Sequence, residues 1–322
     1  MTDKPDLGAL FGATPAETFL GIEKCSDPSR AEGSSAFIGA PGATPYGSVG
    51  AYCRNAPDAL RKATSSLTAN VDRHNFDLGG PIFPTGSRRA VDCGNLPFDE
   101  ADFARNREVI SDTVRKVVGS SAVPILVGGD DSVPIPMLDA LAATGERYTV
   151  LQIDAHIDWR RNHMGEEYGL SSTMRRASEM PHIERILQVG ARGIGSAHTD
   201  DYQDAVAWGA RFFTAHDIHR DGIAPVLDLI PEGTEIVVCT DVDALDPSLV
   251  PGVIGRTPGG LAYHHVLDLF KGAAERGNIA AMDFVEYVPE ADIDGLGALT
   301  TAGLIAAAMG LIARQDSHSG ET

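Results

Sequence analysis

The sequence predicts an α/β fold, a three-layer α/β/α sandwich with a mostly parallel central sheet. Three observations favour it. Short apolar runs alternate along the chain with longer amphipathic stretches. The runs are apolar throughout, as in strands that are buried on both faces of a parallel sheet. With 322 residues, of which 43% are hydrophobic, the chain is long enough to bury one large core.

Six apolar runs are predicted to form strands, at residues 36–38, 123–127, 150–153, 186–189, 236–239 and 279–282. Helical patterns lie between and after them, at residues 98–118, 133–143, 261–276 and 302–314. Pro134 stands near the start of the second of these helices, where its missing N–H costs nothing. Strands and helices that alternate in this way imply right-handed βαβ units.

The domain organisation is predicted to be simple, because no internal repeat, low-complexity run or linker divides the chain. We expect a single domain over residues 34–315. Residues 1–33 lack clear periodicity and are predicted to form an N-terminal arm over the surface or at an oligomer contact. Residues 316–322 are predicted to be a C-terminal tail.

Composition excludes several classes of partner. The chain has 26 basic and 45 acidic side chains, a net charge of −19, whereas a nucleic-acid-binding protein needs a basic surface. The N-terminus shows no signal-peptide core, no apolar run approaches membrane-spanning length, and residues 305–311 are assigned to a core helix. None of the four cysteines stands in a C-x-x-C pair. We therefore expect reduced thiols, no nucleic-acid or membrane partner, and a cytoplasmic protein.

Polar clusters follow four of the predicted strands, at residues 128–132, 154–158, 241–247 and 283–286. In open α/β sheets, ligands bind outside the carboxyl ends of the strands, so these side chains are expected to converge on one crevice. Each cluster alone has a simpler interpretation, because a single Asp-x-Asp after a strand is usually a turn or a helix cap. Their joint occurrence favours a metal site.

The chemistry of that crevice follows from its charge. Its candidate metal ligands are Asp154, His156, Asp158, Asp241 and Asp243. Four carboxylates and one imidazole could not stay ionised together in a low-dielectric site without cations. Two divalent ions held roughly 3.5–4 Å apart would neutralise them and would generate a hydroxide nucleophile near neutral pH. The ligand types favour Mn²⁺, with Ni²⁺ as the alternative and Fe²⁺ or Zn²⁺ also possible.

These motifs resemble those of the ureohydrolase family, which includes arginases, agmatinases and other guanidino-compound hydrolases. The family signatures are matched by Gly-Gly-Asp-Asp-Ser at residues 128–132, Asp-Ala-His-Ile-Asp at 154–158 and Asp-Val-Asp-Ala-Leu-Asp-Pro at 241–247. Further similarity lies at residues 56–61 and 283–289. The resemblance covers roughly residues 36–314, and the second and third motifs are specific in combination.

The resemblance implies a role for each matched position. Asp154 and Asp241 would bridge both metals, Asp158 would complete the sphere of the first metal, and His156 and Asp243 would complete that of the second.

The resemblance also implies the reaction. Glu286 would pair with the substrate guanidinium, a metal-bridging hydroxide would attack its carbon, and Asp158 would handle a proton while urea and an amine leave. It further implies a homo-oligomer, a trimer or a hexamer.

Two departures from the family pattern bear on this assignment. Asp131 stands where the family has a metal-ligating His, and we favour ligation by Asp131 over the alternative that it only caps the helix near Val133. The loop after Asp158 lacks the His-Gly of many relatives. Ser171 or His163 is expected to contact the substrate in its place.

Arg160 and Arg161 in the same loop would repel a long cationic tail, so a guanidino acid or a small guanidine-like substrate stays open. An inward Arg160 could pair with a substrate carboxylate, although a surface role is favoured.

A second hypothesis explains the departures at Asp131 and Leu170 by a non-catalytic homologue, a structural or regulatory subunit of a hetero-oligomeric ureohydrolase. A third, a single-zinc deacetylase, is weaker because it would not need Asp243 and Glu286 together.

Overall fold

The computed structural model describes residues 7–13, 16–195 and 197–318. Its centre is a nine-stranded sheet in the order β1-β3-β2-β4-β9-β8-β5-β6-β7, and neighbouring strands pair in parallel throughout. The strands are β1 (Glu23–Lys24), β2 (Ser35–Gly39), β3 (Val91–Asn95), β4 (Val123–Val127), β5 (Tyr148–Ile153), β6 (Ile183–Val189), β7 (Arg211–Phe213), β8 (Glu235–Asp241) and β9 (Asn278–Val285). The predicted fold class is confirmed.

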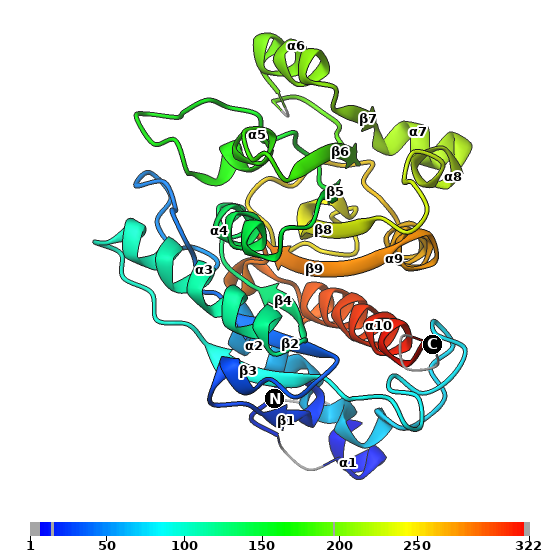
Figure 1. Ribbon diagram of the computed structural model, residues 1–322. Coiled ribbons are helices and arrows are strands. Elements are labelled where there is room, and N and C mark those ends of the chain that lie inside the picture. The colour runs from blue at the N-terminus through cyan, green and yellow to red at the C-terminus, as the bar shows by residue number, and fades with distance from the viewer. Residues whose placement is uncertain (1–6, 14–15, 196, 319–322) are drawn as a thin grey trace.

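Helices cover both faces of this sheet. They are α1 (Leu7–Phe11), α2 (Ala56–Thr64), α3 (Phe103–Gly119), α4 (Pro134–Ala140), α5 (Thr173–Ser178), α6 (Thr199–Trp208), α7 (Ala215–Asp221), α8 (Ala224–Leu227), α9 (Tyr263–Arg276) and α10 (Leu296–His318). Figure 1 shows α3, α4 and α5 on one side of the sheet and α9 and α10 on the other. Ile110 of α3 and Leu138 of α4 pack in one core, and Leu269 of α9 and Leu304 of α10 in the other.

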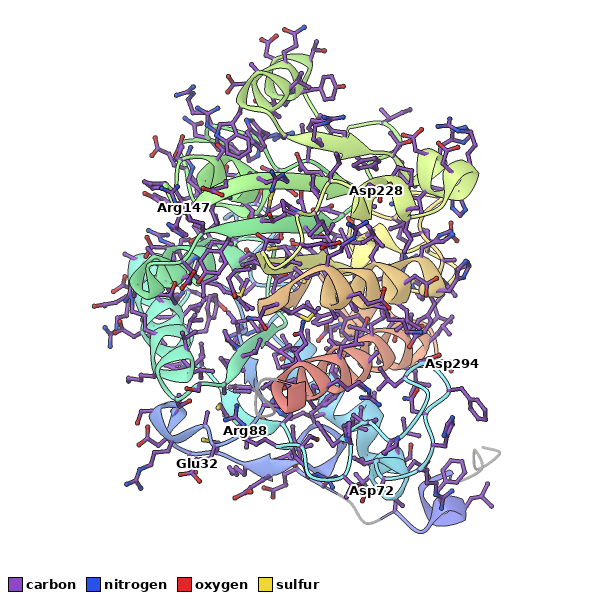
Figure 2. All side chains as sticks on the ribbon, turned by 45° about the vertical axis from the view of Figure 1, so that its right-hand side comes forward. Glu32, Asp72, Arg88, Arg147, Asp228 and Asp294 are labelled. Atoms are coloured by element: carbon purple, nitrogen blue, oxygen red, sulfur yellow. The ribbon has the colours of Figure 1, made fainter. Side chains whose placement is uncertain are left out.

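Charged side chains lie outside these cores. Glu32, Arg147 and Asp228 are exposed, and Figure 2 shows Glu32 and Arg147 near the edge of the molecule. Exposed charges are ordinary at a protein surface, and they contrast with the buried acids described below.

The six predicted strands correspond to β2, β4, β5, β6, β8 and β9, which form the middle of the sheet. Those missed are β1, β3 and β7, which lie at or next to its edges. β3 reads Val-Asp-Cys-Gly-Asn, and such a strand shows no apolar run because it need not be buried on both faces. The helix expected from residue 98 begins at Phe103 because the side chain of Asp102 accepts a hydrogen bond from the backbone N–H of Arg105 at 2.9 Å.

Part of the predicted arm is built into the fold. Phe19 is fully buried, and β1 pairs with β3 at the sheet edge. At the other end, α10 continues to His318, so the first residues of the predicted tail are helical. Residues 1–6, 14–15 and 319–322, which belong to the predicted arm and tail, lie outside the described residues.

Helix α10 corrects one expectation. Its window Leu296–Gln315 has a mean hydropathy of 1.9, so within the described chain this helix is long and apolar enough to cross a membrane by length and composition. The expectation that no apolar run approaches that length was therefore wrong. In the fold, 72% of the window is buried, and α10 packs against α2, α9 and β9. That environment is the one predicted for a core helix.

Strands β4, β9, β8 and β5 are consecutive in the sheet, and all are parallel. Their carboxyl ends therefore lie side by side at one edge. The four polar clusters singled out in the sequence lie at the carboxyl ends of these four strands: two follow β4 and β5, one begins with the last residue of β8, and one spans the end of β9. The topology therefore brings residues from positions 130 to 286 together.

Candidate metal centre and active site

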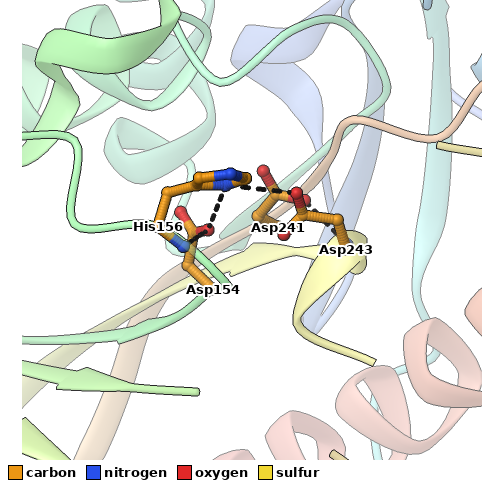
Figure 3. A group of neighbouring side chains, drawn as sticks. All are labelled: Asp154, His156, Asp241 and Asp243. Carbon is orange, nitrogen blue, oxygen red and sulfur yellow. Dashed lines mark hydrogen bonds and ion pairs between the residues drawn. The ribbon is translucent and has the colours of Figure 1, made fainter. Parts of the chain in front are cut away.

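Four candidate ligands from the ends of β5 and β8 form one compact group. One ligand atom from each of Asp154, His156, Asp241 and Asp243 lies within 4.8 Å of the others (Figure 3). Nδ1 of His156 is 3.4 Å from Oδ1 of Asp154 and 3.2 Å from Oδ2 of Asp243. The spacing is suited to a single ion bound by all four side chains.

A second group shares one of these residues. Asp131, Asp154 and Asp158 also offer carboxylate oxygens within 4.8 Å of one another, and all three side chains are buried. Asp154 belongs to both groups, which is the position of a ligand that bridges two ions. Asp241 belongs only to the first of these groups.

The position of Asp131 shows whether this residue can ligate a metal or only caps the helix near Val133. Its Oδ2 is buried and has no hydrogen-bond partner among the described residues, and no side chain caps α4 at Val133. The local turn is instead held by Asp130, whose carboxylate accepts hydrogen bonds from the backbone N–H (3.1 Å) and hydroxyl of Ser132. The helix-cap alternative for Asp131 is therefore wrong, and its carboxylate is free to face Asp154 and Asp158.

The side chains of the cluster carry a large excess of acidic groups. Burial, reinforced by the neighbouring carboxylates, raises the pKa of Asp131, Asp158 and Asp241 well above its usual range. Burial opposes a charge on His156, yet its contacts with Asp154 and Asp243 raise the pKa of this imidazole to about 12. Five buried carboxylates thus have one imidazole among them. Divalent ions would supply the missing charge, and a set of carboxylates with one imidazole fits a hard or borderline ion.

Two residues of the site, Asp158 and Glu286, have unusual backbone φ angles. Asp158 has φ 43° and Glu286 has φ 67°, in the left-handed region that side-chain-bearing residues seldom adopt. Such conformations persist where the surroundings enforce them, and they concentrate at functional sites. The turn after β4 needs glycine for a related reason, because a Cβ on Gly129 (φ 77°) would lie 2.7 Å from the carbonyl oxygen of Ala40.

Buried glutamines orient two of the candidate metal-ligating carboxylates, which are called the metal-type carboxylates below. The side-chain amide of Gln152 donates to Asp154 Oδ2 at 2.7 Å and to Asp158 Oδ2 at 2.9 Å. Gln188 donates in turn to the side-chain oxygen of Gln152 and, at 2.8 Å, to the carbonyl of Ile157. Sequence reasoning missed both glutamines, although a polar residue inside an otherwise apolar strand was a visible signal in each case.

Glu286 is held by donors on both of its oxygens. The hydroxyl of Tyr52 donates to Oε1 at 2.7 Å and to Oε2 at 2.8 Å, and the backbone N–H of Asp131 donates to Oε1 at 2.9 Å. Burial and the charge of Asp130 nevertheless raise the pKa of Glu286 to about 8. Tyr52 was also missed, because nothing in the surrounding sequence marks it as a partner of a residue 234 positions away.

A cavity of about 240 Å³ joins these groups. Asp131, Asp158, Asp241, Asp243, His156 and Glu286 all line it. Ser171, predicted to contact substrate, also lines it, and its hydroxyl lies 2.6 Å from that of Tyr46. His163 does not line the cavity. Its ring packs on Tyr46 with centroids 4.6 Å apart, and its Nδ1 lies 3.0 Å from Nη1 of Arg160.

Comparisons with known proteins agree with this geometry. The chain is 33% identical over 263 residues to a mitochondrial arginase of Medicago truncatula, covering 78% of this chain and 74% of the arginase. It is 34% identical over 259 residues to an N(1)-aminopropylagmatine ureohydrolase of Thermus thermophilus, covering 79% and 84%. The solved structure of proclavaminate amidino hydrolase from Streptomyces clavuligerus superposes with a TM-score of 0.82 at 25% identity, covering 94% and 99%.

The model of the Arginase family matches residues 34–310, a span that contains every candidate ligand and Glu286. With the fold, the two overlapping carboxylate groups and these relatives in agreement, the chain belongs to the Arginase family.

Proposed function

We propose that this chain is a metal-dependent hydrolase of a guanidino compound that cleaves a C–N bond and releases urea and an amine. One observation carries the proposal. Glu286, a buried carboxylate, lines the same small cavity as the metal-type carboxylates. A guanidinium bound to Glu286 would therefore sit beside the group of residues that can hold a nucleophile. The names of the relatives, an arginase, a ureohydrolase and an amidino hydrolase, support the same chemistry.

The two overlapping groups define the proposed metal ligands. Asp131, Asp154 and Asp158 would hold one ion, and Asp154, His156, Asp241 and Asp243 the other. As the family resemblance implies, Asp241 would bridge both ions as Asp154 does. Mn²⁺ is the proposed metal, with Ni²⁺ as the alternative. When bound, such ions supply a hydroxide at neutral pH and polarise the group under attack.

The protein side chains then have two tasks. Glu286 accepts hydrogen bonds from the planar guanidinium and fixes its carbon in front of the nucleophile. A C–O bond forms to that carbon, the bond from the same carbon to the nitrogen that bears the alkyl group breaks, and the leaving amine needs a proton. Asp158, which lines the cavity and accepts a hydrogen bond from Gln152, would take a proton from the nucleophile and pass it to the amine. Water and the guanidino compound thus become urea and an amine.

The assembly and the location of the protein remain proposals. We propose a homo-oligomer, a trimer or a hexamer, in the cytoplasm, with no nucleic-acid or membrane partner. Light scattering coupled to size-exclusion chromatography would test the assembly directly.

The activity is tested by measuring urea release from agmatine, arginine, 4-guanidinobutyrate, 3-guanidinopropionate and guanidine. Metal-stripped protein is reloaded separately with Mn²⁺ and Ni²⁺, and metal per chain is measured in the same samples. We expect metal-dependent urea release from at least one compound and its loss in Asp154→Ala and Asp243→Ala. No urea from any compound, with less than one metal bound per chain, would overturn the proposal and favour a non-catalytic subunit.

A further inference from the structure

We infer that the preferred substrate carries a carboxylate at the end remote from its guanidinium, and that Arg160 binds this carboxylate. The inference rests on the proposed function, because it names the substrate class of the same cavity. It concerns a side chain for which a surface role was expected from the sequence.

Arg160 lines the cavity together with Glu286 and the metal-type carboxylates. Its side chain is partly buried, and its hydrogen bond among the described residues is to Nδ1 of His163 at 3.0 Å. No carboxylate of the described chain pairs with it, although the protein carries a large excess of acids. A guanidinium has five N–H donors, so several remain for a ligand.

The backbone of Arg160 is fixed at its own N–H and at the two residues before it. Its N–H donates to the carbonyl of Ser171 at 2.9 Å, and the preceding Trp159 is buried. The carbonyl of Asp158 accepts from the N–H of Arg175 at 3.1 Å. The position of Arg160 relative to Asp158 is therefore set before a substrate arrives, which reduces the ordering cost of binding.

Neighbouring groups complete a place for a carboxylate. His163, held against Tyr46, can only accept from Arg160, because a guanidinium only donates. The hydroxyls of Tyr46 and Ser171, 2.6 Å apart, line the cavity beside Arg160. At any moment one hydroxyl of this pair can donate to the other while the second donates to a ligand oxygen. A carboxylate would thus meet a forked cation and a hydroxyl donor.

Asp201 is an acidic residue that also lines the cavity, and it could attract a substrate ammonium. It belongs to the first turn of α6, where a carboxylate has a local role because it interacts favourably with the N-terminal N–H groups of the helix. An ammonium tail in the same cavity would meet the uncompensated guanidinium of Arg160. We therefore favour the anionic tail, and the cationic tail is the outcome that would contradict it.

The test compares 4-guanidinobutyrate with agmatine, which have similar chains but end in a carboxylate and an ammonium respectively. The wild-type kcat/KM is expected to be higher for 4-guanidinobutyrate. In Arg160→Gln, the ratio of kcat/KM for 4-guanidinobutyrate to that for agmatine should fall about 10- to 150-fold, the scale of a hydrogen bond to a charged group. Arg160→Lys should restore part of the ratio. Arg161→Gln is the matched control, because Arg161 is the exposed neighbour that does not line this cavity.

The outcomes separate this inference from the proposed function. Urea release from agmatine in preference to 4-guanidinobutyrate, or an equal loss for both compounds in Arg160→Gln, overturns the inference and leaves the hydrolase intact. If no compound yields urea, calorimetric titration of metal-loaded protein with 4-guanidinobutyrate still decides. Binding that is lost in Arg160→Gln and kept in Arg161→Gln supports the carboxylate site, and the absence of binding by the wild type overturns it.

Discussion

Asp92 on β3 and the carboxylates around Asp154 are all buried, but their surroundings differ. Arg61 donates from Nε and Nη2 to the two oxygens of Asp92 at 2.8 and 2.9 Å. The backbone N–H groups of Phe19 and Gly94 add hydrogen bonds of 2.9 and 2.8 Å. Asp92 is therefore neutralised within the chain and ties the N-terminal segment to the sheet.

Among the described residues, no arginine or lysine is seen to form an ion pair with the cluster at the carboxyl edge of the sheet. Five carboxylates share His156 and the amide of Gln152, and Asp131 keeps an oxygen without a hydrogen bond. The two regions teach that burial of an acid is not itself a sign of function. The informative feature is a buried negative charge that the chain leaves uncompensated, because such a site is stable only when protons or external cations bind.

The largest expected effect comes from removing one carboxylate of the cluster. In Asp241→Asn, we expect urea release to fall at least on the order of 10³-fold, because the nucleophile and its electrostatic support depend on the metals. Metal per chain should fall as well. The metal-free variant should be no less stable than metal-free wild type, since one source of repulsion is gone. A variant that retains full metal content and activity would contradict the assignment of Asp241.

Removing the cation that pairs with Asp92 should have the opposite effects, lower stability and unchanged metal content. Arg61→Met leaves Asp92 buried without its cation, which is expected to lower the free energy of unfolding by about 3–5 kcal/mol. Chemical denaturation of the metal-free protein would measure this loss. Metal per folded chain should stay at the wild-type value. A loss of metal without a loss of stability would show that the two regions are not independent.

A smaller effect is expected from pH. Burial raises the pKa of Asp283 to about 7 and that of Glu286 to about 8, and the pKa values of Asp131, Asp158 and Asp241 are raised in the same direction. A carboxyl with a raised folded-state pKa stabilises the fold below its unfolded pKa of about 4, and this contribution is lost as pH rises through the folded-state value. Metal-free protein should therefore lose stability between pH 4 and pH 8.

Bound metal should reverse this trend, because it replaces the protons of the cluster. His156 acts in the same sense, since its raised pKa stabilises the metal-free fold below about 6.5 and the contribution fades as pH rises above that value. The stabilisation free energy gained from Mn²⁺ should consequently be larger at pH 8 than at pH 6, by roughly 1.4 kcal/mol per pH unit for each proton displaced, and the increase in Tm should be larger in the same sense. Differential scanning calorimetry with EDTA or Mn²⁺ measures it. An increase that is equal at both pH values would argue against proton displacement by metal.

The sequence predicted the central strands and the acidic cluster correctly, because both follow from local patterns in a parallel sheet. Continuous apolar runs identified the central strands, and the acids that follow β5 and β8 had to meet because parallel strands end at one edge. Strand β3, next to the edge strand β1, was missed because its polar residues make other contacts: Asp92 binds Arg61, and Asn95 accepts a hydrogen bond from the same guanidinium.

Other parts of the site could not be predicted because they depend on contacts between distant segments. An Asp that follows a strand can cap a helix or bind a metal, and only the positions of Asp130 and Asp131 in the fold separated these possibilities. The hydrogen bond from Tyr52 to Glu286 joins two loops that no local pattern connects. Likewise, the sequence could not show whether Arg160 faces solvent or the cavity.

The smallest expected effect comes from removing the hydroxyl of Tyr52, which donates to the cavity carboxylate Glu286. Its hydroxyl lowers the pKa of Glu286, so Tyr52→Phe should raise that pKa further and leave less carboxylate at neutral pH. Because guanidinium binding needs the anion, KM should rise by several-fold, about 1 kcal/mol, with a smaller change in kcat. The acid limb of the kcat/KM profile should move to higher pH. Tyr263→Phe is the control. The hydroxyl of Tyr263 donates to Asp77 at 3.1 Å, and neither residue lines the cavity of the candidate metal site. A merely structural role for Tyr52 would lower stability in both variants alike and leave the pH profile where it is.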